Sequence, residues 1–142
     1  TSSRLSVEDA VCEVKWENGI QFNSFVHASN QVGWFRFKGV GKGFEPVLVP
    51  PAYNTKGKNE VESPVSGQDL RRLGYPKGKI DKDKNSITYT QEGWGGFIYE
   101  VNVTWIKNGD VLEGCWSISS DFPGWEKTPK STEIVKEELE QG

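Results

Sequence analysis

The clearest alternation of apolar and polar residues runs from Phe97 to Ser119. Two stretches with a period of two flank Asn108-Gly109, a dipeptide that is typical of two-residue hairpin turns. A turn at this dipeptide places Trp105 opposite Leu112, and the apolar residues of both strands then share one face. The pattern therefore predicts an antiparallel hairpin with a core face and a polar face, and it puts Cys115 on the polar face.

A second hairpin is predicted between Ala10 and Ser29, around Glu17-Asn18-Gly19. A two-residue turn here mixes polar and apolar side chains on both faces. A three-residue loop with Gly19 in the left-handed conformation instead pairs Val14 with Phe22 and makes one face apolar. We therefore expect the bulged form, with Trp16 on the core face.

The remaining patterns predict two strands, one long loop and one helix. Residues 31–40 read as a strand covered on both sides, because Trp34 and Phe35 are neighbours, and residues 86–91 read as a short strand. Residues at about 41–67 hold four prolines without periodicity, which predicts an extended loop. Thr128-Pro129 opens a predicted helix whose apolar face is Ile134, Val135 and Leu139. We expect this helix to dock on the sheet or to continue in a longer protein.

Length and composition place these elements in one all-β domain. A chain of 142 residues fits a single core, and its 16 glycines and 12% aromatic residues suit short strands packed through rings. We expect an antiparallel β-sandwich, complete or partial, over residues 1–127 and a linker helix over 128–142. The two cysteines, Cys12 and Cys115, leave pairing open in the sequence alone, and the predicted hairpins favour two free thiols.

Charge narrows the classes of partner. A net charge of −3 argues against nucleic acid, because phosphate binding depends on clustered Lys and Arg. The tract from Lys77 to Lys84 mixes signs and predicts a solvated turn without function. The longest apolar runs fall short of the roughly 20 residues that a membrane span needs, so we expect no membrane span. We also expect no metal and no cofactor.

Candidate chemistry is sparse. The lone His27 has no recognisable catalytic partner, and Asp69, Glu92 and Asp121 are only weak candidates for paired-carboxylate chemistry. We therefore expect no catalytic residue in this chain. Aromatic rings in predicted loops can stack on sugars while polar groups take the hydroxyls. The carbohydrate-binding candidates are Trp94, Trp125, Tyr75 and Asp69. The alternative is that these rings plug the ends of the sandwich, whereas Trp16, Trp105 and Trp116 are assigned to the core.

Two stretches of the chain carry a family resemblance. Residues 5–40, with VEDAVCEVKWENGIQFNSFVHASNQVGWFRF, and residues 67–121, with GQDLRRLGYP and YTQEGWGGFIYEVNVTW, resemble the N-terminal β-sandwich of large secreted bacterial glycoside hydrolases. The similar enzymes are of the fucosidase and disaccharide phosphorylase type, in which this domain precedes an (α/α)6 barrel. The family's sandwich is usually larger than this chain.

The resemblance implies a non-catalytic domain that braces the catalytic barrel of the same polypeptide, where the catalytic carboxylates lie. It also implies an extracytoplasmic location, whether periplasmic, cell-surface or secreted, and a polysaccharide or oligosaccharide as partner. Two alternatives are an independent carbohydrate-binding module and a structural or interaction domain without sugar affinity.

Overall fold

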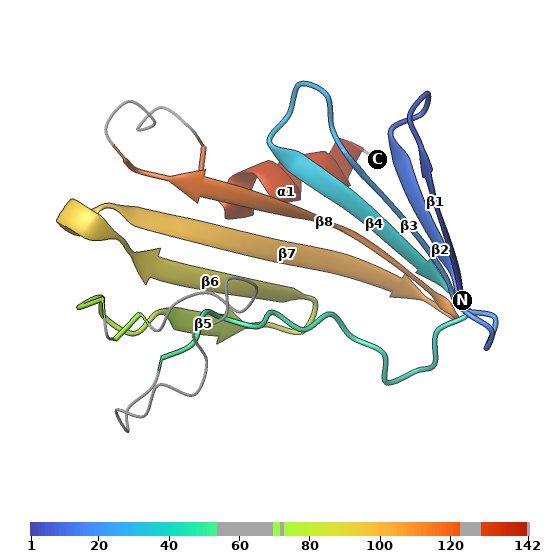
Figure 1. Cartoon of the computed structure of the whole chain (residues 1–142), viewed down its shortest axis with the longest axis horizontal. Helices are drawn as coiled ribbons and strands as arrows, with labels where there is room; N and C mark the ends of the chain where they lie inside the picture. The colour runs from blue at the N-terminus through green and yellow to red at the C-terminus, as the bar shows by residue number, and fades with distance from the viewer. Residues whose placement is uncertain (54–69, 72, 123–128, 142) are drawn as a thin grey trace.

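A computed structural model describes residues 1–53, 70–71, 73–122 and 129–141 of the chain. Eight antiparallel strands form one sheet in the order β1-β2-β3-β4-β8-β7-β6-β5 (Figure 1), which confirms the predicted all-β antiparallel fold. The elements are β1 Ser2–Ser6, β2 Val11–Lys15, β3 Gln21–Val26, β4 Val32–Lys38, β5 Lys79–Lys82, β6 Ser86–Glu92, the 3-10 turn η1 Trp94–Gly96, β7 Ile98–Asn108, β8 Val111–Ser120 and α1 Ser131–Gln141.

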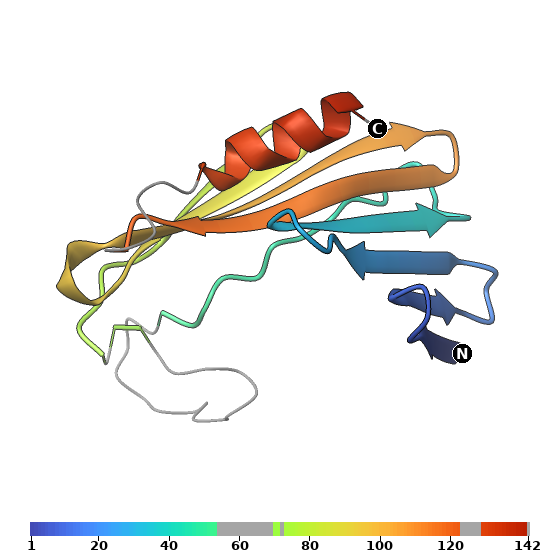
Figure 2. The ribbon, with the colours of Figure 1, turned by 90° about the horizontal axis from the view of Figure 1, so that it is seen from above.

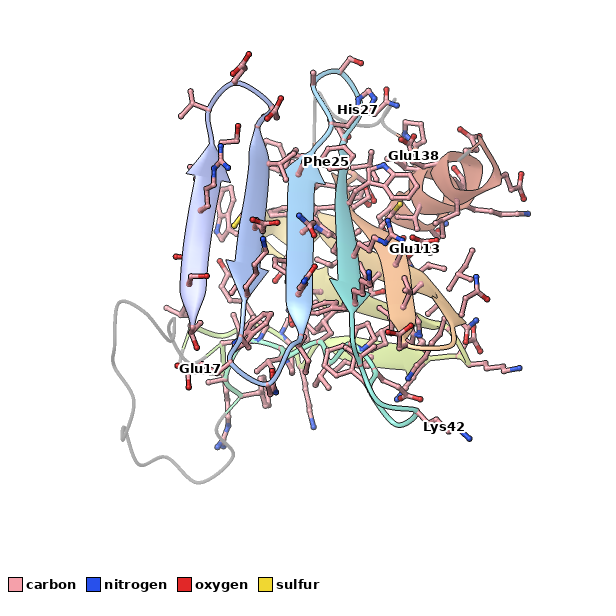
Figure 3. All side chains as sticks on the ribbon, turned by 90° about the vertical axis from the view of Figure 1, so that its right-hand side faces the viewer. Glu17, Phe25, His27, Lys42, Glu113 and Glu138 are labelled. Atoms are coloured by element: carbon pink, nitrogen blue, oxygen red, sulfur yellow. The ribbon has the colours of Figure 1, made fainter. Side chains whose placement is uncertain are left out.

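The sheet consists of two four-stranded meanders, β1–β4 and β5–β8, joined where β4 pairs with β8. It is strongly curved, because Phe22 of β3 and Ile87 of β6 pack into the same cluster although three strands separate β3 from β6. Figure 3 shows the curvature from the side, with the blue strands in front of the green ones. We call the face inside the curve the concave face and the other the convex face.

The concave face carries the main core. Trp105 and Leu112 are almost completely buried there, as the alternation of the β7–β8 hairpin predicts. Burying one such large side chain contributes about 1.5–3 kcal/mol. The buried members of this cluster are Phe35, Val40, Ile87, Trp105 and Leu112.

Helix α1 covers the convex face over β7 and β8 (Figure 2). Val135 is fully buried against Val32 and Cys115, with Ile134 and Leu139 packed beside them. The apolar residues of the predicted helix therefore do dock on the sheet. Cys115 lies on the face opposite to the main core, as predicted, but the prediction that this face is a polar surface is wrong here, because α1 buries the Cys115 side chain. The helix begins at Ser131, after the predicted start at Thr128.

The helix is fixed at both ends by polar contacts. At its N-terminus, Glu100 Oε1 accepts hydrogen bonds from Ser131 Oγ at 2.7 Å and from Thr132 N at 3.3 Å. Near its C-terminus, Trp34 Nε1 donates to Glu138 Oε1 at 3.1 Å and Asn30 Nδ2 donates to Glu138 Oε2 at 3.2 Å. Figure 3 shows Glu138 at the end of the sheet that also holds Phe25 and His27.

The segment 40–53, which we call the strap, crosses the concave face on the side opposite to α1 (Figure 2). Lys107 Nζ donates to the carbonyl oxygens of Gly41, Lys42 and Phe44 at 2.6, 2.7 and 3.1 Å, and Val40 N donates to Asp110 O at 3.0 Å. No strand forms in the described part of the predicted loop, in agreement with its prolines. The strap is thus an irregular segment tied firmly to the β7–β8 turn.

One hairpin keeps its predicted register and the other does not. Val14 pairs with Phe22, and Gly19 has a φ of +86°, as the bulged loop requires. In the β7–β8 hairpin, however, Trp105 pairs with Gly114, two positions away from the predicted partner. A side chain at Gly114 would overlap the Thr104 carbonyl, so a glycine fits the position opposite the large indole. Because the shift is two residues, every side chain keeps its predicted face.

The core assignments of the tryptophans hold only in part. Trp105 is buried, and Trp116 is half-buried beside the same cluster. Trp16 is 38% exposed, so its assignment to the core is wrong. It follows the end of β2 in the hairpin loop, where its backbone N–H donates to Ile20 O and its side chain lies outside the described cluster.

Candidate functional site

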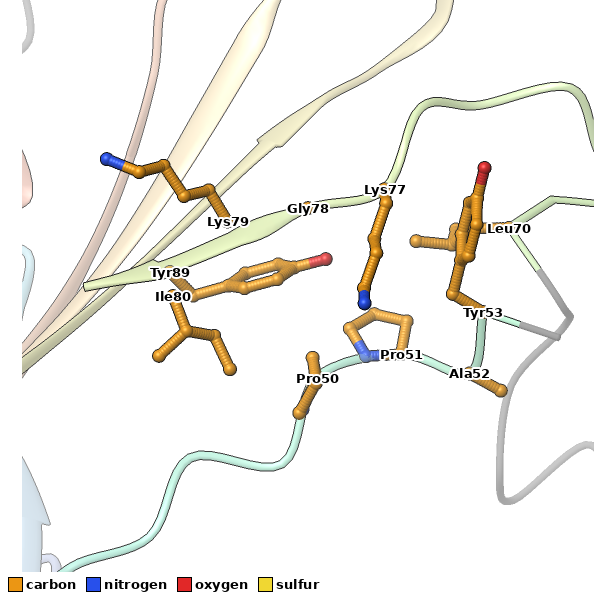
Figure 4. Close-up of a pocket in the computed structure, with 10 residues that line it drawn as sticks. All are labelled: Pro50, Pro51, Ala52, Tyr53, Leu70, Lys77, Gly78, Lys79, Ile80 and Tyr89. Atoms are coloured by element: carbon orange, nitrogen blue, oxygen red, sulfur yellow. The ribbon is translucent and has the colours of Figure 1, made fainter. Parts of the chain in front are cut away.

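A pocket of about 800 Å³ opens between the end of the strap and strands β5 and β6 (Figure 4). We call it the tyrosine pocket. Its apolar walls come from the strap and from β5, and its rings and amines come from the end of the strap, from the segment that leads into β5, and from β5 and β6. It is lined by Pro50, Pro51, Ala52, Tyr53, Leu70, Lys77, Gly78, Lys79, Ile80 and Tyr89. Its volume is within the range of about 300–1,000 Å³ that small-molecule sites occupy.

Tyr89 forms a rigid wall of this pocket. The alternation of β6 points Ile87, Tyr89 and Gln91 toward the concave face, and the Tyr89 ring lies over Gly78, where any side chain would overlap it. Its hydroxyl donates to Gln91 Oε1 at 2.7 Å. Burial raises the pKa of Tyr89 to about 12, and the neighbouring Tyr99 acts in the same direction. Tyr89 therefore stays neutral and fixed at ordinary pH.

Gln91 holds the chain that leads into the pocket. It is 2% exposed, and its Nε2 donates to Pro76 O at 3.0 Å and to Glu92 O at 2.7 Å. This arrangement satisfies both hydrogens of the buried amide and leaves its oxygen for Tyr89. The segment before β5 is thereby fixed against β6.

The four tyrosines of the chain gather at this end of the molecule. Tyr53 and Tyr89 line the pocket, and the Tyr99 ring is 6.1 Å from the Tyr89 ring between centroids. Tyr75 N donates to the backbone oxygen of Leu70, which itself lines the pocket. The predicted candidate Tyr75 thus lies next to the site rather than in its wall.

Positive charge marks the tyrosine pocket in a protein that is acidic overall. Lys79 pairs with Asp81 at 2.8 Å, whereas Lys77 forms no ion pair within the described residues. Figure 4 shows the Lys77 side chain reaching toward Pro51 between the rings of Tyr89 and Tyr53. The described lining includes no Asp or Glu. The pocket is therefore suited to a ligand that carries a negative group.

A second hollow of about 470 Å³ lies under the strap, over the middle of the concave face. We call it the phenylalanine groove. Phe22, Phe37, Phe44 and Trp116 contribute partly exposed rings to it. The whole lining is Phe22, Ser24, Phe35, Phe37, Phe44, Glu45, Pro46, Val47, Leu48, Ile87, Val103 and Trp116.

The two predicted binding residues that the structure describes, Trp94 and Tyr75, do not line a common pocket. Trp94 is 77% exposed in η1 and lines neither the tyrosine pocket nor the phenylalanine groove. Asp69 and Trp125 lie outside the described residues, so their predicted roles stay predictions. Of the four candidates, only Tyr75 is placed beside a pocket.

The residues that build the tyrosine pocket were missed for different reasons. The sequence predicts a solvated turn over Lys77 to Lys84, but Lys79–Lys82 forms the edge strand β5 instead. Its exposed charges are typical of an edge strand that must resist pairing with other chains. Ile87, Tyr89 and Gln91 are alternate residues of one strand. This alternation could have indicated that Tyr89 faces the same side as Ile87 and forms a wall of the pocket. No local signal could have placed Lys77 opposite Tyr53, because the strap brings them together.

The other reactive groups occupy structural positions. His27 Nδ1 accepts hydrogen bonds from Ser29 N at 3.2 Å and Asn30 N at 3.0 Å, so it closes the turn between β3 and β4. Both thiols are free, with Cys12 half-buried and Cys115 buried. No group of three or more His, Cys, Asp or Glu residues suited to a metal occurs in the described part of the chain. Among the described residues, no helix is long and apolar enough to cross a membrane.

Comparisons with protein-family models, with curated proteins and with solved structures find no match to this chain.

Proposed function

We propose that this chain is a non-catalytic carbohydrate-binding domain whose tyrosine pocket holds a sugar residue bearing a negative group. The observation that carries the proposal is the meeting of the Lys77 ammonium and the Tyr53 ring in one pocket of about 800 Å³. Lys77 is exposed and forms no ion pair within the described residues, so its ammonium is free to pair with an anion, and a sugar acid supplies one.

The chemistry of the pocket suits the two sides of a sugar. The apolar C–H face of a pyranose can stack on the half-exposed Tyr53 ring and on Pro51. A carboxylate on the same sugar would accept hydrogen bonds from Lys77. Tyr89 already donates to Gln91, so its contribution is the shape of the wall rather than a free hydroxyl donor.

The wider role of the domain is part of the same proposal. A domain that braces a catalytic barrel of one polypeptide, in an extracytoplasmic glycoside hydrolase, is supported by the sequence resemblance alone. The sequence of a longer polypeptide with a following helical domain and paired carboxylates would support this role, and a following domain of another kind would contradict it.

The binding test compares acidic with neutral sugars by isothermal titration calorimetry. We expect glucuronate or galacturonate oligosaccharides to bind saturably, neutral counterparts to bind at least tenfold more weakly, and added salt to weaken the acidic sugars selectively. Lys77→Gln should remove the preference. Lys84→Gln is the matched control, because Lys84 belongs to the same tract but does not line the pocket.

Two results would contradict the proposal. Absence of binding at millimolar sugar would favour a structural or interaction domain. Binding that Lys77→Gln leaves unchanged and Trp94→Ala abolishes would move the sugar site to η1, where Trp94 is exposed.

A further inference from the structure

We propose that the phenylalanine groove binds the linear hydrocarbon chain of an amphiphile whose polar head lies in the tyrosine pocket. The identity of the head rests on the function proposed above. The chain site rests on the groove itself, so the two parts can fail separately.

The groove offers an apolar chain a surface without unpaired charges among its described lining residues. Its one acid, Glu45, is held by Lys82 at 2.8 Å, and this contact lowers the pKa of Glu45 so that the carboxylate stays ionised in its ion pair. Its hydroxyl, on Ser24, donates to Trp34 O at 2.8 Å. A hydrocarbon chain therefore displaces water without stranding a polar group.

The groove is held open by its walls. The ring centroids of Phe22 and Phe37 are 4.6 Å apart and those of Phe37 and Phe44 are 4.9 Å apart, so the rings support one another. Trp116 occupies the space above Gly33, where a side chain would overlap the indole. The bonds of Lys107 to three strap carbonyls fix the start of the roof, at residues 41–44. Phe44 and Leu48 of the strap also pack against the core cluster, so the strap rests on these side chains at both ends of the groove's strap wall.

The groove and the tyrosine pocket lie end to end. Along β6, Ile87 lines the groove and Tyr89, the next residue on the same face, lines the pocket. Along the strap, Leu48 lines the groove and Pro50 lines the pocket. The two hollows thus form one route with an apolar section and a section that carries Lys77. This order matches an anionic head followed by an apolar tail.

The size of the groove favours a small molecule over a protein segment. A volume of about 470 Å³ is within the range of small-molecule sites, whereas a stable protein interface buries on the order of 800 Å² on each partner. The strap also covers the middle of the concave face (Figure 2), where a partner helix or strand would have to lie. A single extended chain can lie under this roof.

The test is a series of n-alkyl glucuronides from methyl to octyl, titrated by calorimetry below their critical micelle concentrations. We expect the association constant to rise about threefold to fourfold for each methylene, which corresponds to the free energy of burying one CH2 group, until the groove is full. The same series of alkyl glucosides should show the same slope with weaker binding throughout.

Two strap variants test the location of the chain. Val47 lines the groove at its rim and Val49 does not, although both are more than 80% exposed. Val47→Asp should weaken octyl glucuronide binding at least tenfold and leave methyl glucuronide unchanged. Val49→Asp is the control and should leave both unchanged. Because both side chains are exposed, neither variant should unfold the protein, which thermal unfolding checks.

The outcomes distinguish a failure of the chain site from a failure of the sugar site. Methyl glucuronide binding without a chain-length gain, or equal effects of Val47→Asp and Val49→Asp, would overturn the chain site and leave the sugar site standing. A chain-length gain with equal affinities for glucuronides and glucosides, and with no effect of Lys77→Gln, would support the groove and contradict the sugar proposal. Absence of binding throughout the series would overturn both.

Discussion

The Trp116 indole fills the space that a side chain at position 33 would occupy. Gly33 and Trp116 are direct partners across the β4–β8 pair, and a methyl group on Gly33 would overlap three atoms of the ring. The same relationship recurs where Tyr89 lies over Gly78 and where Phe35 approaches Gly114. Rings placed over glycines in neighbouring strands, or directly before one, thus shape the concave face, a device that compensates glycine in a sheet.

Gly33→Ala should destabilise the protein by about 1–3 kcal/mol, because the indole must move within a packed face. Urea unfolding followed by tryptophan fluorescence measures the loss. Gly41→Ala is the control, since a side chain there meets open space and no positive φ is involved. A Gly33→Ala protein as stable as the Gly41→Ala protein would contradict the packing described here.

Cys115 should resist thiol reagents in the folded protein. It is fully buried under α1, and this burial raises the pKa of the thiol to about 12, with the nearby Glu138 acting in the same direction. Because the thiolate is the reactive form, a Cys12→Ser variant should react with a disulfide reagent at pH 8 only after unfolding. Fast labelling of that variant under native conditions would show that the helix does not cover the thiol.

Alkaline pH should weaken the fold. Cys115 and Tyr89 ionise at about 12 in the folded chain, against ordinary values of 9.0 and 10.0. The folded state therefore keeps protons that the unfolded state loses, so the stabilisation is complete below pH 9 and falls as the pH rises toward 12. Urea unfolding at pH 7, 9 and 10.5 should show a decreasing free energy of unfolding. The decrease should be smaller in a Cys115→Ala, Tyr89→Phe double variant, and an equal decrease in that variant would assign it to other groups.

Glu100→Ala should loosen the start of α1. It removes the acceptor of Ser131 Oγ and Thr132 N and leaves the buried Ser131 hydroxyl without this partner, at a cost of about 1–2 kcal/mol. Hydrogen exchange should become faster in the first turn of α1. The exposed Glu140, near the other end of the helix, supplies the control variant Glu140→Ala. Equal exchange in the two variants would show that Glu100 does not anchor the helix.

Local patterns in the sequence predicted the strands in which apolar and polar residues alternate with a period of two. The alternation in β7 and β8 assigned Trp105 and Leu112 to the core side, and the Gly19 loop fixed the register of β2 with β3. The register of β7 with β8 could not be predicted, because it places Gly114 where a side chain would overlap the Thr104 carbonyl and the Phe35 ring. The turn preferences of the residues alone favoured Asn108-Gly109 as the two-residue turn.

The candidate site was less accessible to prediction, because long-range contacts create it. Trp94 in its glycine-rich turn is exposed, as expected of a loop residue. It lines neither the tyrosine pocket nor the phenylalanine groove. Lys77 belongs to a mixed charge tract that reads as solvent-exposed, and only the strap gives it neighbours from residues 50–53. Likewise, the polar face around Cys115 gave no indication that a helix would bury it.

The pairing of β4 with β8 also determines how the chain must fold. Hairpin contacts join residues that are close in sequence, but partners across this seam, from Val32 with Ser117 to Lys38 with Val111, are separated by 73 to 85 positions. Closing so long a loop has an entropic cost that local pairing does not have, which slows folding. Each meander can form its hairpins first, and the Trp116 indole can settle over Gly33 only when the two meanders meet. The contact that shapes the groove is therefore also a late marker of complete assembly.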